Sequence, residues 1–191
     1  MKLLSVDIET TGLDPSTCSV LEVGAVLFDP QPDLSAPPVQ RRWQTFERLI
    51  RHKQIQGEPY ALQLNKDILA ELCGVKKTHI SIVKAASVGP ALAEWLRSYG
   101  ISESNKATIV GKNYDAFDRQ FLNRVPGWNA FVGPLVERRT LDVGSLYFCP
   151  DDGKVVGLEA CLQTIGADTT VSHRALDDAL QVATAVSRFF T

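Results

Sequence analysis

The chain has 191 residues, 45% of them hydrophobic and 22% charged, which predicts one domain with a complete core. Its net charge of −2 excludes a strongly basic, nucleic-acid-binding surface spread over the whole molecule. The N-terminus reaches an acid too early for a signal peptide, and no apolar run approaches the roughly 18 residues of a membrane span. The four cysteines show no C-x-x-C spacing. We therefore expect a cytoplasmic protein with reduced, mostly buried thiols.

The hydrophobic pattern predicts strands first and then alternating helices and strands. Strands are expected over residues 3–13, 20–28, 41–50, 107–111 and 139–146, and the first of them is expected to end in a turn over 10–16. Helices are expected from residue 59 to about 72 and over 88–99, 114–124, 158–165 and 174–190, while 74–86 is ambiguous. This order predicts an α/β fold in which helices cover a mixed sheet.

The first strand carries two carboxylates, Asp7 and Glu9, within an otherwise apolar stretch. Side chains alternate along a strand, so both acids point to the same face. Like charges this close repel each other and are costly to bury without a partner. A divalent cation such as Mg²⁺ or Mn²⁺ is the simplest partner for hard oxygen ligands. The alternative is a surface strand with two solvated acids.

A third acid lies within an apolar stripe on the helix expected over 114–124. The stripe combines Tyr114, Phe117 and Phe121 at helical spacing, and Asp118 falls inside it. A carboxylate on an apolar face must be paired, neutral or bound to a metal. Asp115 falls nearer the edge and is interpreted as a solvated or capping acid.

The last helix adds a fourth acid and a histidine. Asp178 borders the apolar face of this helix, whereas Asp177 lies nearly opposite and is expected on the surface. His173 precedes the helix and sits about a turn and a half before Asp178. His52 and His79 are interpreted as structural or merely exposed.

Three stretches resemble the motifs of the DEDDh 3′→5′ exonucleases of the DnaQ-like superfamily. They are D-I-E-T-T-G-L at 7–13, G-K-N-Y-D-A-F-D at 111–118 and H-R-A-L-D-D-A at 173–179. Their order and the five-residue spacing between His173 and Asp178 match the family's pattern. The chain departs from it at Lys112, where the family often has a histidine; this leaves the catalytic set intact and is expected to alter substrate contacts.

The resemblance implies a ribonuclease H-like mixed sheet flanked by helices on both faces, in a single exonuclease domain over residues 1–191. It further implies hydrolysis of single-stranded DNA or RNA from the 3′ end, releasing nucleoside 5′-monophosphates. Two divalent cations, Mg²⁺ or Mn²⁺, would be held by the four acids, and His173 would act as general base. The catalytic residues implied are Asp7, Glu9, Asp118, His173 and Asp178.

Substrate contacts are expected at Thr10, Gly12, Leu13 and Asn113. Leu13 either packs against a base or covers the core, and Asn113 either contacts the substrate or holds the loop of its motif. Among the basic residues, Arg138, Arg139 and Arg174 lie nearest the expected site in sequence and could steer phosphates.

Other readings stay open at this point. The rivals are a silent nucleic-acid or protein-binding module and a phosphodiesterase for small nucleotides, although all five family residues are present. The choice between DNA and RNA depends on the fit around a 2′-hydroxyl, which the sequence does not reveal. A homodimer and a DNA polymerase or repair partner are further expectations.

Overall fold

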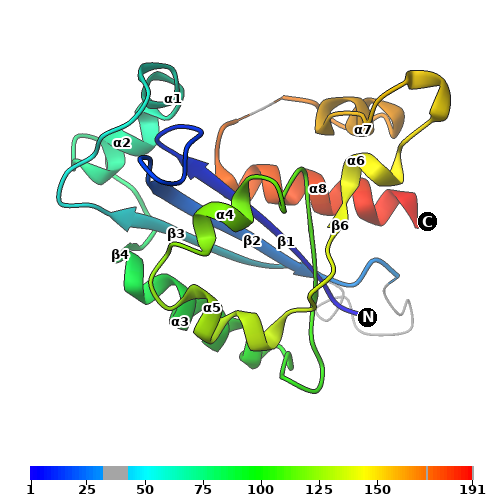
Figure 1. Ribbon diagram of the computed structural model, residues 1–191, viewed down its shortest axis with the longest axis horizontal. Coiled ribbons are helices and arrows are strands. Elements are labelled where there is room, and N and C mark those ends of the chain that lie inside the picture. Colours follow the sequence, from blue (N-terminus) through cyan, green and yellow to red (C-terminus); the bar gives the residue numbers. More distant parts are fainter. Residues whose placement is uncertain (32–42, 171, 191) are drawn as a thin grey trace.

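The computed structural model describes residues 1–31, 43–170 and 172–190. Within them six strands form one mixed sheet in the order β4-β3-β2-β1-β5-β6 (Figure 1). The strands are β1 (Leu3–Thr10), β2 (Val20–Phe28), β3 (Gln44–Arg51), β4 (Ile82–Lys84), β5 (Thr108–Gly111) and β6 (Leu141–Asp142). β1, β2 and β3 pair antiparallel, whereas β4, β5 and β6 each join their neighbour in parallel.

Helices cover both faces of this sheet. They are α1 (Pro59–Leu64), α2 (Lys66–Leu72), α3 (Ala85–Ser98), α4 (Asp118–Leu122), α5 (Trp128–Phe131), α6 (Val143–Leu146), α7 (Leu158–Thr164) and α8 (Ala175–Phe189), with short 3₁₀ turns at Gly133–Leu135 and Pro150–Asp152. α3, α4 and α5 share one apolar cluster with one face of the sheet, and α6, α7 and α8 share a second with the other face. Figure 1 shows α8 lying along the sheet and α1 and α2 grouped at one end of it.

The alternation of side chains along β1 divides the strand between the two cores. Leu4, Val6 and Ile8 belong to the cluster beneath α3 and α4. Leu3 belongs to the cluster beneath α8. Because side chains of a strand alternate, Asp7 and Glu9 point to the α8 face. The strand therefore buries apolar residues on one side while it presents two acids on the other.

The expected α/β fold is confirmed, and several expected elements differ in their bounds. The predicted strand over 139–146 is wrong beyond Asp142, because the Asp142 carboxylate accepts the Ser145 N–H and so begins α6. The predicted helix over 114–124 is confined to α4. Asn113 has a positive φ of 60°, and its carbonyl accepts the N–H groups of Ala116 and Phe117 in a turn before the helix. The single helix expected after residue 59 is divided into two at Asn65.

Two further expectations concern the start of the third strand and the burial of the cysteines. The third strand begins at Gln44, and the expected start at residues 41 and 42 lies outside the described residues. All four cysteines are free, as expected, but only Cys161 is buried. Among the described residues, no helix is both long and apolar enough to span a bilayer.

Candidate active site

Three of the predicted ligands meet on the α8 face of the sheet. Asp7, Glu9 and Asp178 each place a carboxylate oxygen within 4.8 Å of the other two. Asp178 Oδ1 is buried and has no hydrogen-bond partner among the described residues. A buried carboxylate oxygen without a donor is costly, and a hard divalent cation is the partner that satisfies it. The donor set therefore fits Mg²⁺ or Mn²⁺.

The pKa values of these acids also indicate a site that is suited to a bound positive charge. Burial raises the pKa of Asp7 well above its ordinary value, and repulsion from Asp118, Asp178 and Glu9 adds to the rise. Burial and the charge of Asp178 raise the pKa of Glu9 to about 7. Without a cation the raised pKa values favour the protonated carboxyls, whereas a bound cation would favour the ionised ones.

Asp118 stands slightly apart from this group. It is the first residue of α4 and is only 3% exposed. Burial raises the pKa of Asp118 to about 7, while hydrogen bonding to its own backbone and that of Ile8 opposes the rise. Its charge contributes to the raised pKa of Asp7, which places it beside the three-acid group. The inward position expected for this acid agrees with its burial, although it lies at a helix start rather than within a long helix.

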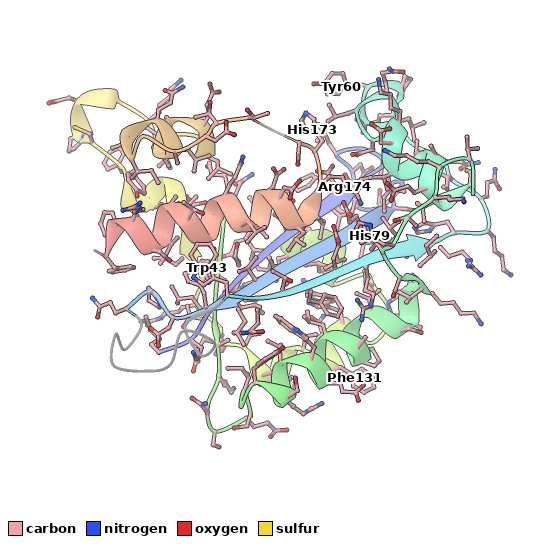
Figure 2. The ribbon with its side chains drawn as sticks, turned by 180° about the vertical axis from the view of Figure 1, so that it is seen from behind. Trp43, Tyr60, His79, Phe131, His173 and Arg174 are labelled. Atoms are coloured by element: carbon pink, nitrogen blue, oxygen red, sulfur yellow. The ribbon has the colours of Figure 1, made fainter. Side chains whose placement is uncertain are left out.

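The start of α8 brings His173 and Asp178 to the site. His173 is half-buried, has a positive φ of 52° and lies where the chain enters the helix (Figure 2). Burial and the charges of Asp177 and Glu22 raise the pKa of Asp178 to about 6, whereas a charged His173 would lower it. Asp177 is exposed, as expected, and accepts a hydrogen bond of 2.7 Å from the Ser172 hydroxyl. Asp178 therefore faces the site and Asp177 faces solvent.

The turn after β1 presents Leu13 to solvent. Leu13 is 74% exposed, so the alternative in which it covers the core is wrong. Its N–H donates to Glu58 Oε1 at 3.0 Å, and the Glu58 N–H donates to the Thr11 carbonyl at 2.8 Å. Gly12 is buried in this turn, where an added Cβ would lie 2.5 Å from Cys18 Sγ. The Thr10 hydroxyl is buried and donates to the Gly12 carbonyl at 2.8 Å.

Asn113 supports its own loop through the main chain. Its N–H donates to Asp142 Oδ2 at 2.6 Å, so one aspartate both caps α6 and holds the loop before α4. The Asn113 side chain itself is exposed. Beside the loop, Asp115 is exposed and bonds with Arg119 and Thr140, in agreement with its interpretation as a solvated acid.

Two contributions to the site were not identified from the sequence. Asn65 is 3% exposed, bonds to the Thr10 carbonyl and stabilises the Glu9 carboxylate through its side chain. Glu22 is fully buried on β2, opposite Glu9 in the β1–β2 register, and pairs with Arg174. The sequence signal for Glu22 was a lone acid within a continuous apolar strand. Arg174 is held by carboxylates, which does not support its suggested role in steering phosphates.

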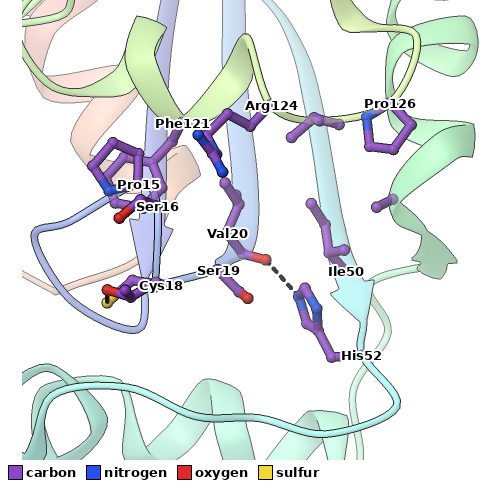
Figure 3. Close-up of a pocket in the computed structure, with 13 residues that line it drawn as sticks. Pro15, Ser16, Cys18, Ser19, Val20, Ile50, His52, Phe121, Arg124 and Pro126 are labelled. Carbon is purple, nitrogen blue, oxygen red and sulfur yellow. Dashed lines mark hydrogen bonds between the residues drawn. The ribbon is translucent and has the colours of Figure 1, made fainter.

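A cavity of about 280 Å³ lies on the other face of the sheet, bordered by residues 15–20, the end of β3 and the segment after α4 (Figure 3). His52 lines it and forms a 2.7 Å hydrogen bond with the Val20 carbonyl. This bond holds the start of β2 against the segment after β3, in agreement with the structural interpretation of His52. Arg124 and Phe121 line the opposite wall.

Comparison with known proteins assigns the family. A sequence model of the exonuclease family, RNase T, matches residues 4–186. No curated protein sequence matches the chain. The nuclease domain of 3′hExo, a DEDDh family member bound to rAMP, superposes with a TM-score of 0.70 and 16% identity, covering 99% of this chain and 91% of that one.

Two further solved structures share the fold. Cell-death related nuclease 4 (CRN-4) gives a TM-score of 0.67 at 16% identity, covering 99% of this chain and 63% of that one. E. coli Exonuclease I in complex with a dT13 oligonucleotide gives 0.66 at 15% identity, covering 100% of this chain and 41% of that one. The chain thus spans less than two thirds of either protein. The chain belongs to the exonuclease family, as its DEDDh motifs predicted, and is a nuclease with a ribonuclease H-like fold.

Proposed function

We propose that the protein is a metal-dependent 3′→5′ exonuclease that hydrolyses single-stranded DNA or RNA and releases nucleoside 5′-monophosphates. Residues 1–191 would form one such domain. The observation that carries the proposal is the meeting of Asp7, Glu9 and Asp178, where a buried oxygen of Asp178 has no hydrogen-bond partner in the described part of the chain. Acids so arranged suit the binding of cations that act on a phosphodiester.

All four acids would take part in binding the cations. Asp7, Glu9 and Asp178 form the central group, and Asp118 adds a carboxylate from α4. When bound, two divalent cations would lower the pKa of an attacking water and stabilise charge on the phosphate and the leaving oxygen. The protein fixes the acids on β1, α4 and α8, so their positions do not depend on a mobile loop.

His173 is the proposed general base. An imidazole changes protonation near neutral pH and can accept the proton of the attacking water. His173 lies within electrostatic reach of Asp178 at the start of α8. The neighbouring carboxylate would stabilise the imidazolium that forms when the proton is taken up.

The turn that follows β1 is proposed to receive the 3′ end of the strand. Exposed Leu13 would pack against the terminal base, and Thr10 would lie near the sugar. Gly12, which has no side chain, allows the main chain of this turn to lie close to Cys18 and Glu58. Asn113, whose side chain is exposed, would be a further contact. Two structurally similar nucleases were solved with rAMP and with a dT13 oligonucleotide, which supports a nucleotide or oligonucleotide ligand at this site.

A time course on gels tests the proposal. Single-stranded DNA and RNA of one sequence, labelled at the 5′ end, are incubated with Mg²⁺, with Mn²⁺ or with EDTA. We expect a ladder that shortens from the 3′ end only when a cation is present, and the faster substrate identifies the preferred sugar. His173→Ala should slow this hydrolysis with little loss of cation binding.

The same gels, extended to dinucleotide substrates and accompanied by Mn²⁺ titrations that measure cation binding, separate the rival functions. Cation binding without cleavage of either strand would contradict the proposal and favour a binding module. Cleavage confined to dinucleotides would favour a phosphodiesterase for small nucleotides. Equal losses of cleavage and cation binding in His173→Ala would make His173 a ligand instead of a base.

A further inference from the structure

A fifth carboxylate lies beside the proposed catalytic group, on the neighbouring strand β2. Glu22 on β2 is fully buried, and no step of the proposed hydrolysis uses it. Its charge contributes to the raised pKa values of Asp7, Glu9 and Asp178, so it lies close to all three. A buried carboxylate beside other carboxylates requires compensation from a cation or from several donors.

Arg174 supplies most of that compensation. Its Nη2 donates to Glu22 Oε1 at 2.7 Å, and its Nε lies 3.2 Å from both Glu22 oxygens. The N–H of Ala175 donates to Glu22 Oε2 at 3.0 Å. Glu22 therefore receives the guanidinium and the first helical N–H of α8 together.

The same guanidinium also reaches α2. Arg174 Nη1 donates to Glu71 Oε1 at 3.1 Å, and Glu71 is only 5% exposed. Glu47 on β3 lies 3.9 Å from Nη2. One side chain thus connects α8 with β2, β3 and α2, and its planar fork is suited to bind two carboxylates at once. Figure 2 shows Arg174 beside His173 at the entry to α8.

The main chain around Arg174 is also held in place by close contacts. An added Cβ at Gly24 would lie 2.2 Å from the Ala175 carbonyl carbon, so the start of α8 rests directly on β2. The Arg174 carbonyl accepts the N–H of Asp178 at 3.0 Å. His173 precedes Arg174 with a positive φ, a conformation that an L residue keeps only when its surroundings impose it.

We propose that Arg174 is a positioning residue of the hydrolytic site, which sets the places of His173 and Asp178 relative to Asp7 and Glu9 by joining α8 to Glu22 and Glu71. It acts through these carboxylates and makes no contact with the nucleic-acid strand. This inference rests on the proposed exonuclease function. It assigns a role to the arginine of the H-R-A-L-D-D-A stretch that differs from phosphate steering.

Variants of Arg174 test the proposal. In Arg174→Gln we expect kcat on a single-stranded oligonucleotide to fall about 100-fold, because a small displacement of reacting groups has such an effect. KM for the oligonucleotide should change by less than about twofold, since no strand contact is lost. Arg174→Lys keeps the charge but cannot bind both carboxylates, so its kcat should be intermediate. Millimolar guanidinium should partly restore kcat in Arg174→Ala.

The matched control is Arg97→Gln, an exposed arginine in the last turn of α3, which should leave both constants unchanged. If Arg174→Gln does not fold, Glu71→Gln removes one arm of the network and should lower kcat without raising KM. A raised KM with an unchanged kcat would overturn the proposal in favour of a strand contact, and unchanged constants would also overturn it.

Cation affinity separates this inference from the proposed function. Mn²⁺ binding is followed by titration in wild type and Arg174→Gln, and we expect weaker binding in the variant because Asp178 is displaced. A wild-type protein that binds Mn²⁺ but cleaves no strand would contradict the exonuclease proposal alone. Equal Mn²⁺ affinity in the two proteins, together with equal kcat, would contradict the positioning role alone.

Discussion

The side-chain amide of Asn65 donates a 2.9 Å hydrogen bond to the main-chain carbonyl of Thr10, the last residue of β1. The same side chain bonds to Glu9 and lowers the pKa of that carboxyl against the effect of burial. Asn65 lies between α1 and α2, so these helices are attached directly to the strand that carries two of the acids. The orientation of Glu9 therefore depends on a residue from a different segment.

Asn65→Ala tests this dependence. The variant loses the donor to Glu9, and we expect the half-saturating Mg²⁺ concentration to rise about 10-fold or more, as for other groups that orient metal ligands. Stability should fall by about 1–3 kcal/mol because the buried Thr10 carbonyl loses its partner. Mg²⁺ titration of hydrolysis and chemical denaturation measure the two effects. Wild-type Mg²⁺ dependence would exclude a role for Asn65 in the site.

Asp178→Asn and Asp177→Asn form a matched pair on adjacent residues. Asp178→Asn should abolish turnover while stability without cations is kept or increased, since repulsion from Asp7 and Glu9 falls. Asp177→Asn should be nearly silent because this side chain is exposed. Single-turnover rates and thermal melts in EDTA distinguish them. An inactive Asp177→Asn beside an active Asp178→Asn would reverse the assignment.

The raised pKa values predict an unusual pH dependence of stability without cations. Glu9 and Asp118 have pKa values of about 7 in the folded protein, above the ordinary values near 4 of an unfolded chain. A carboxyl whose pKa is raised by folding contributes its full stability below its unfolded pKa and loses it as pH rises through the folded pKa. In EDTA we therefore expect Tm to fall between about pH 4 and pH 7.

Cations should reduce this fall, because they bind the ionised acids and stabilise the folded state. Part of the slope should remain with Mg²⁺ or Mn²⁺. Glu47 also has a pKa of about 7, through burial and repulsion from Glu22, and is outside the three-acid group. Thermal melts over this pH range, with and without cations, measure both effects. A Tm in EDTA that rises with pH would contradict the raised pKa values.

Leu13→Ala separates substrate binding from folding. The side chain is 74% exposed, so its removal should change stability by less than about 0.5 kcal/mol. KM for a short oligonucleotide should rise about 10-fold or more if the side chain packs on a base, since fully covering a leucine side chain is worth about 1.5–3 kcal/mol. Val75→Ala, at an equally exposed residue between α2 and β4, is the control. An unchanged KM in Leu13→Ala would remove this contact from the proposal.

Local patterns in the sequence were sufficient to predict the placement of the acids. The alternation of β1 predicted that Asp7 and Glu9 share a face, and the periodicity of the last helix separated Asp178 from Asp177. These inferences need only the geometry of a single strand or helix. They remained valid even where an element was shorter than expected, as at Asp118.

The supporting contacts could not be predicted because they join distant segments. Nothing local in β2 indicates that Glu22 pairs with Arg174, which follows it by 152 residues. The turn at Asn113 depends on Asp142, and the break between α1 and α2 coincides with the bond from Asn65 to Thr10. The interactions at Asn113 and Asn65 override the local preference for a longer helix.

The placement of α8 also has a consequence for synthesis of the protein. This helix supplies Asp178 and packs on the face of the sheet that carries Leu3, Val26 and Phe28, yet it follows every other described helix in the chain. While the ribosome has not released residues 175–189, the nascent chain holds Asp7, Glu9 and Asp118 but lacks the residues that complete the group. Nuclease activity would therefore begin only after translation has passed α8.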